Sequence, residues 1–153
     1  IEVSIAKQAK LQLALAPGLP PVRLRLFLQP DHVGQETRFF ASASAALTAY
    51  GRWFGPYPYG QLTIVDAAYL SGSGGMEYPM LVTASTRWLA PQAVAEPESA
   101  VAHEVGHQFW YGLVGSNEVE HAWMDEGVNQ FSESRLFDTG ALRGQAEENP
   151  CAA

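Results

Sequence analysis

The chain has 153 residues, of which 47% are hydrophobic, so it is long and apolar enough for one folded domain and is not a disordered tail. Nine Lys and Arg residues against 16 Asp and Glu residues give a net charge of −7, which argues against binding to nucleic acid or to an anionic membrane surface. The single cysteine, Cys151, cannot form an internal disulfide, and no apolar run reaches the roughly 18 residues of a transmembrane segment. These properties leave the cellular compartment open.

The first part of the chain is expected to form strands around one long helix. Residues 1–16 alternate weakly between apolar and polar side chains, and residues 22–28 alternate more clearly, as in a strand. Residues 36–54 are rich in alanine and place their large apolar side chains on one helical stripe. The short apolar run at residues 62–65 predicts a buried strand.

The second part of the chain is expected to carry an edge strand followed by two helices. A glycine-rich loop at residues 71–75 leads into the run 76–82. This run is predicted to be an edge strand, because Pro79 has no N–H to donate to a neighbouring strand. Helical patterns then cover about residues 100–113 and 122–137, and each is followed by a glycine. This order predicts an α+β fold in which helices pack on a small sheet.

A His-Glu-x-x-His pattern stands in the first of these two helices, at His103-Glu104-Val105-Gly106-His107. Residues four apart lie on one face of a helix, so the imidazoles of His103 and His107 can reach one metal ion. Glu104 lies about 100° round the helix from His103, close enough to take a proton from a water on that ion. The alternative is a pair of helix histidines with satisfied hydrogen bonds and no metal.

A catalytic zinc site needs a third protein ligand and an open fourth position. Glu126 follows His107 after 18 intervening residues, within Trp123-Met124-Asp125-Glu126-Gly127 on the next predicted helix, and can supply that ligand. Glu133 lies seven residues further on the same helical face, where it is expected to bond the outer nitrogen of a ligand histidine. The sequence therefore predicts one Zn²⁺ per chain, with Glu104 as the general base.

A second motif lies in the glycine-rich loop, where Gly74-Gly75-Met76-Glu77-Tyr78 places Glu77 26 residues before His103. Together with the zinc motif, the 18-residue gap and Trp-Met-Asp-Glu-Gly, it resembles the gluzincin zinc aminopeptidases of the aminopeptidase N family, over roughly residues 22–138. The resemblance implies a thermolysin-like catalytic lobe. In such a lobe Glu77 would bind the free α-amine of a peptide, and the backbone of Gly74, Gly75 and Met76 would pair with the substrate.

The sequence departs from that family in two respects. Tyr78 replaces the asparagine that usually ends the loop motif. The family also uses a tyrosine well downstream of the third ligand to stabilise the oxyanion, and no tyrosine follows Tyr111. By the resemblance, we also expect the helical domain that closes the cleft in the family to lie outside these 153 residues. A chain with these departures is expected to assemble the metal site and to be a weak catalyst by itself.

The resemblance also leads us to expect a piece of a longer protein, whose N-terminal and helical domains would be partners of this lobe. Residues 1–21 would then be a lead-in segment or the remnant of a preceding domain, residues 22–140 the catalytic lobe, and residues 141–153 a loose tail. The other expected partner is a peptide with a free N-terminus, and neither nucleic acid nor a membrane-spanning segment is expected.

Two other functions stay open on the residues alone. A zinc endopeptidase would use the same metal chemistry without needing Glu77. A non-catalytic binding module could keep zinc for stability, although structural zinc needs no general base such as Glu104. The remaining histidines, His32 and His121, are expected on the surface.

Overall fold

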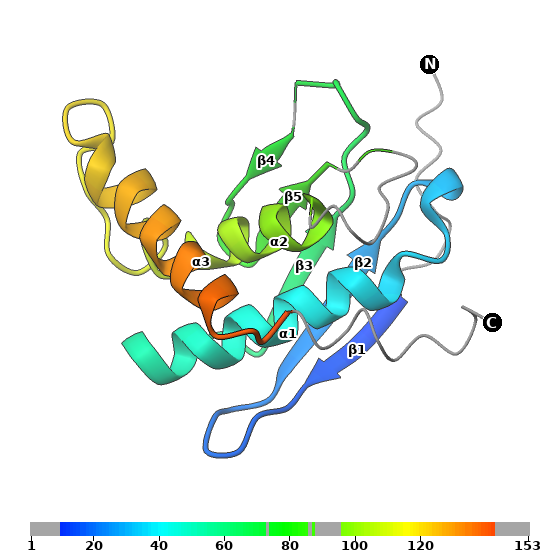
Figure 1. Cartoon of the computed structure of the whole chain (residues 1–153), viewed down its shortest axis with the longest axis horizontal. Coiled ribbons are helices and arrows are strands. Elements are labelled where there is room, and N and C mark those ends of the chain that lie inside the picture. The colour runs from blue at the N-terminus through cyan, green and yellow to red at the C-terminus, as the bar shows by residue number, and fades with distance from the viewer. Residues whose placement is uncertain (1–9, 73, 86, 88–95, 143–153) are drawn as a thin grey trace.

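The computed structural model describes residues 10–72, 74–85, 87 and 96–142. In these residues α1 and α2 cover one face of a five-stranded sheet, and α3 packs against α2 (Figure 1). The elements in chain order are β1 (Lys10–Ala14), β2 (Val22–Phe27), the 3-10 turn η1 (Pro30–His32), α1 (Glu36–Phe54), β3 (Gln61–Val65), β4 (Gly75–Met76), β5 (Leu81–Ala84), α2 (Glu96–Gly106), the π-helical turn η2 (Trp123–Gly127) and α3 (Val128–Asp138). The predicted α+β fold is confirmed.

The sheet is mixed, with the strand order β1-β2-β3-β5-β4. Its three inner strands, β2, β3 and β5, run parallel to one another. The two outer strands, β1 and β4, pair antiparallel to their neighbours. The two-residue strand β4 therefore forms one edge of the sheet, and its outer side carries no strand among the described residues.

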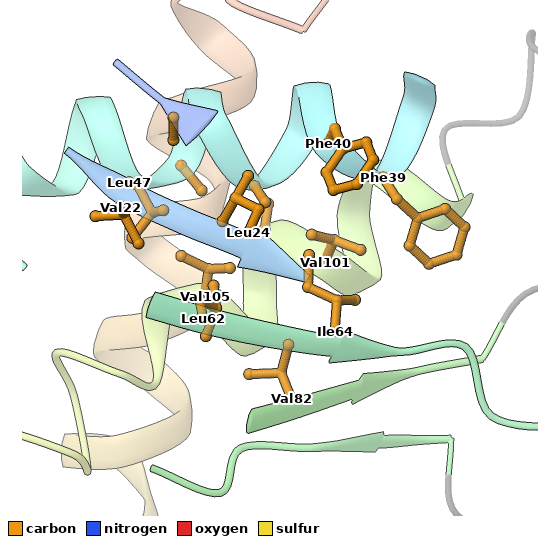
Figure 2. Close-up of a cluster of buried hydrophobic side chains, with 14 of the residues drawn as sticks. Val22, Leu24, Phe39, Phe40, Leu47, Leu62, Ile64, Val82, Val101 and Val105 are labelled. Carbon is orange, nitrogen blue, oxygen red and sulfur yellow. The ribbon is translucent and has the colours of Figure 1, made fainter. Parts of the chain in front are cut away.

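Apolar side chains between the sheet and the two covering helices form the core (Figure 2). Along β2, Val22, Leu24 and Leu26 are buried while Arg23 between them is exposed, as expected for a strand with one covered face. The core residues labelled in Figure 2 come from β2, β3, β5, α1 and α2: Val22, Leu24, Leu62, Ile64, Val82, Phe39, Phe40, Leu47, Val101 and Val105. The contact anchors α2 on the sheet, so the rest of α2 is held in a fixed orientation beside β4.

Three predicted elements differ from the structure. The run 76–82 is not one edge strand, because a turn at Tyr78–Leu81 divides it into β4 and the inner strand β5. Helix α2 begins at Glu96, before the expected position, since Pro97 can occupy a first helical turn without losing a hydrogen bond. It ends at Gly106, and the second predicted helix is divided into η2 and α3.

His32 is buried, so the expectation that it lies on the surface was wrong. Its Nδ1 lies 2.5 Å from a carboxylate oxygen of Asp66, which also accepts a hydrogen bond from the backbone N–H of Gln29. A polar side chain after a Pro-Asp turn can be buried in this way when a partner satisfies it. The division of the chain at residues 21 and 140 stays a prediction, and residues 143–153 lie outside the described part.

Among the described residues, none of the helices combines the length and the hydropathy that a membrane crossing requires.

Candidate metal centre and active site

The two histidines of the His-Glu-x-x-His pattern face each other across one turn of helix. His103 lies in α2, and His107 continues the turn beyond its last residue, with its backbone N–H bonded to the carbonyl of His103. The two Nε2 atoms are 3.1 Å apart. His107 is fully buried, while His103 is partly open to solvent. The Nε2 atoms of His103 and His107 can therefore both point at one small ion.

Glu126 approaches this pair from the turn η2. Its Oε2 lies 3.3 Å from Nε2 of His103 and 3.6 Å from Nε2 of His107. A tetrahedral zinc with bonds of 2.0–2.1 Å separates its ligand atoms by about 3.3 Å, so the triangle of His103, His107 and Glu126 has the size of a zinc site. The side chain of Glu126 is 60% exposed, so the triangle is open to solvent on this side, where a fourth ligand of an ion could bind.

The outer nitrogens of both histidines meet carboxylates. Nδ1 of His103 lies 3.1 Å from Glu133, and the hydroxyl of Ser99 donates a hydrogen bond to the same carboxylate. Nδ1 of His107 lies 3.1 Å from the carbonyl oxygen of Trp110 and 2.7 Å from Asp125. With the proton held on Nδ1, each ring presents the lone pair of Nε2 to the triangle. The hydrogen bond to Glu133 also raises the pKa of His103, against the opposing effect of burial.

Sequence reasoning missed Asp125. It is buried, and its carboxylate contacts Nδ1 of His107, whereas its exposed neighbour Glu126 approaches the Nε2 atoms of both histidines. The available signal was its place beside the third ligand, but helical spacing alone puts adjacent residues on different faces. Glu77, His107 and Asp125 also form a group of possible ligand atoms, within 4.8 Å of one another. The geometry of the first triangle suits zinc better, because two imidazoles and one carboxylate form a typical zinc set.

Glu104 lies beneath the edge strand. Its side chain is buried, and burial raises its pKa to about 7, with His103 and His107 acting in the opposite direction. Its Oε2 has no hydrogen-bond partner in the described part of the chain. A Cβ atom added at Gly75 would lie 2.1 Å from its Oε1, so the backbone of β4 lies directly on the carboxylate. A carboxylate of this kind is poised to exchange a proton near neutral pH.

The glycine-rich loop brings Glu77 to the other end of the triangle. The loop is anchored to β5, where Ser85 N–H donates to Gly74 O at 2.7 Å and Met76 pairs with Thr83. A carboxylate oxygen of Glu77 lies within 4.8 Å of ligand atoms of His107 and Asp125. Tyr78 and His121 are exposed and lie outside the triangle.

A cavity of about 410 Å³ opens between β4, α2 and α3. Its walls include Gly74, Gly75, Ser99, His103, Glu104 and Glu133. The cavity therefore extends from the buried carboxylate of Glu104 past His103 of the triangle. An extended chain on the open edge of β4 would run along this space, since an edge strand offers unpaired backbone groups.

The sequence profile of the Peptidase family M1 domain matches residues 40–149, which is most of the chain. The chain belongs to peptidase family M1. The match includes most of α1, the loop with Glu77, and all residues of the triangle. It therefore agrees with the resemblance that the two motifs suggested.

Curated relatives of this M1 chain are much longer. Leucine aminopeptidase 2 of Pyricularia oryzae is 30% identical over 135 residues, which are 88% of this chain and 21% of that protein. Leukotriene A-4 hydrolase of Xenopus laevis is 32% identical over 91 residues, which are 60% of this chain and 14% of that protein. The chain thus spans about a fifth of the first relative and less of the second.

A solved structure shares the fold. The crystal structure of Legionella pneumophila aminopeptidase A in complex with aspartic acid matches with a TM-score of 0.75. The match covers 89% of this chain and 17% of that one, at 16% identity. The arrangement of sheet and helices in this M1 chain is therefore that of a lobe in a larger aminopeptidase structure.

Proposed function

We propose that this chain is the catalytic lobe of a zinc aminopeptidase, which removes N-terminal residues from peptides. The observation that carries the proposal is the triangle of His103, His107 and Glu126 beside the buried carboxylate of Glu104. The name of the Pyricularia oryzae relative, a leucine aminopeptidase, supports a peptide substrate. Glu77 at the His107 end of the triangle supports recognition of a free α-amine.

Each residue then has a defined task. His103, His107 and Glu126 would hold one zinc, which when bound supplies a Lewis acid that polarises the scissile carbonyl. Glu104 takes a proton from the attacking water as the water oxygen bonds to the carbonyl carbon. It then gives that proton to the leaving nitrogen as the C–N bond breaks. Glu133 and Asp125 keep the imidazoles oriented through Nδ1.

The amine-binding task of Glu77 separates this proposal from an endopeptidase. Glu77→Ala in the full-length natural protein should lower kcat/KM far more for an amino-acid anilide, which has a free α-amine, than for a peptide substrate whose α-amine is blocked. Steady-state kinetics on both substrates measure the difference. Equal losses on the two substrates would indicate an endopeptidase. Absence of any turnover by a zinc-loaded full-length protein would favour a non-catalytic module.

We further propose that zinc binding and catalysis separate in the 153-residue polypeptide on its own. The metal residues all lie within it, but no tyrosine follows Tyr111 to serve as the family's oxyanion donor. Loss of one oxyanion donor costs about 10²–10³ in kcat. A zinc titration beside an anilide assay tests this. Full activity in the 153-residue polypeptide would contradict it, and His121 would be the first donor to examine.

A further inference from the structure

Gln108 follows the second histidine of the metal triangle, yet its side chain points away from the triangle and contacts the loop that carries Glu77. Gln108 is 1% exposed. Its Oε1 accepts a hydrogen bond of 2.8 Å from the backbone N–H of Met80. Its Nε2 donates to the carbonyl oxygens of Tyr78 at 3.1 Å and Glu77 at 3.4 Å. One buried amide thus bonds backbone groups of three residues, Glu77, Tyr78 and Met80.

The turn that Gln108 holds has an unfavourable backbone. Leu81 N–H donates to the carbonyl of Tyr78, which closes a four-residue turn with Pro79 in second place and Met80 in third. Met80 has a φ of 62°, a conformation that favours glycine at this place in a turn. A non-glycine residue keeps such a conformation only where its surroundings hold it. Two partners hold it here, Gln108 at the N–H of Met80 and Thr63 at its carbonyl.

These contacts tie the amine side of the site to the metal side. His107 and Gln108 are adjacent in the chain. The side chain of His107 faces the metal triangle, and that of Gln108 bonds the backbone of Glu77. Any shift of the turn relative to the segment with His107 and Gln108 has to break hydrogen bonds of the buried Gln108 amide. Breaking them costs more free energy than breaking hydrogen bonds that water can replace. The spacing between the Glu77 carboxylate and the metal residues is therefore set largely through Gln108.

We propose that Gln108 is a positioning residue, which holds the Glu77 carboxylate at the distance from the metal that an N-terminal residue requires. The inference rests on the proposed aminopeptidase function, because it assigns Gln108 to the amine-binding loop. A purely structural hydrogen bond would lower stability and leave the recognition of the amine unchanged. The two roles therefore differ in a binding ratio that stability does not affect.

Two zinc-binding hydroxamates measure that ratio. Leucine hydroxamate carries an α-amine, and 4-methylpentanoic hydroxamate is the same molecule without it. Isothermal titration of both compounds into the zinc-loaded full-length natural protein gives their dissociation constants. The ratio is the constant of the amine-free hydroxamate divided by that of leucine hydroxamate, and it measures the contribution of the amine. Gln108→Met keeps the side-chain volume and removes all three bonds. Gln108→Glu keeps an acceptor for Met80 N–H and loses the donor, so it serves if the methionine variant fails to fold.

Ser132→Ala is the matched control. Ser132 of α3 is equally buried, and its hydroxyl accepts a hydrogen bond from Trp110 and donates one to the carbonyl of Val128, neither of which belongs to the loop. Glu77→Ala gives the ratio without an amine anchor. We expect Gln108→Met and Gln108→Glu to lower the ratio about tenfold, by weakening leucine hydroxamate alone, and Ser132→Ala to leave it unchanged.

Three outcomes would overturn the inference. An unchanged ratio in a folded Gln108 variant would show a structural role only. A Gln108 variant that weakens both hydroxamates equally, or loses zinc, would place the residue in support of the metal site. A wild-type ratio near one would remove the amine-binding function itself, and would be seen before any Gln108 variant is made.

Discussion

The metal side of the site, on α2, η2 and α3, and the loop side, on β4 and the turn after it, position their groups by different means. On the metal side, side chains meet side chains, and each histidine of the triangle is held by a carboxylate. On the loop side, the backbone lies against Glu104 at Gly75 and is held from behind by Gln108. The first side therefore depends on the chemical identity of its side chains. The second depends on a glycine without a side chain at position 75 and on a long side chain at Gln108.

The largest effect is expected on the metal side, from His103→Ala. Zinc should fall from about one per chain to a trace, because two remaining ligands cannot complete a tetrahedral site. Elemental analysis after gel filtration measures the zinc. His121→Ala is the control, since His121 is exposed and outside the triangle. Unchanged zinc in a folded His103→Ala protein would refute the site.

The next effect separates the base from the ligands. Glu104→Gln removes the proton acceptor and keeps the shape of the side chain, so zinc should stay bound. In the full-length natural protein, kcat should fall by about two to four orders of magnitude. Stopped assays with long incubation can follow such slow turnover, and zinc content is measured on the same sample. Normal turnover would show that Glu104 is not the base.

The closeness of His103, His107 and Glu126 could be predicted from the sequence, whereas the backbone of the loop side could not. Spacing of four places His103 and His107 on one helical face whatever the surrounding fold, so their meeting could be foreseen. The contacts of Asp125 and Gln108 could not be foreseen, because Asp125 lies in a π-helical turn and Gln108 bonds a turn with a positive φ at Met80, and residue spacing reveals neither turn. The run 76–82 was expected as one strand, since alternation does not reveal a turn whose third residue is methionine rather than glycine.

The loop side can be tested with two neighbouring glycines. A Cβ at Gly75 would lie 2.1 Å from Glu104, whereas one at Gly74 would meet only the Ser85 hydroxyl, at 3.5 Å. Gly75→Ala should therefore displace either β4 or the Glu104 carboxylate and lower kcat/KM by about ten- to a hundredfold. Gly74→Ala should stay within about twofold of the wild type, because 3.5 Å is an ordinary contact. Equal activities of the two variants would show that the close approach of β4 to Glu104 has no catalytic role.

The smallest effect concerns the contact that keeps the two helices of the metal side together. Gly106 of α2 faces Asn129 of α3, whose Nδ2 donates to the carbonyl of His103 at 2.9 Å. A Cβ at Gly106 would lie 1.9 Å from Oδ1 and 3.0 Å from Cγ of Asn129, which is fully buried and has little room to move. Gly106→Ala should therefore lower the free energy of unfolding by about 1–3 kcal/mol.

Gly127→Ala is the control for that change, and it should act in the opposite direction. Gly127 also has a helical backbone, with a φ of −69°, and a Cβ there would meet only the Cβ of Trp123 at 3.5 Å. Alanine is more favourable than glycine in a helix by up to about 1 kcal/mol, so this variant should be as stable as the wild type or slightly more stable. Thermal unfolding of metal-free protein measures both, at about 2–4 °C per kcal/mol for a chain of this size. If Gly106→Ala proved as stable as Gly127→Ala, the close packing of α2 on α3 would not be what holds His103 against Glu133. The geometry of the metal side would then depend on zinc itself.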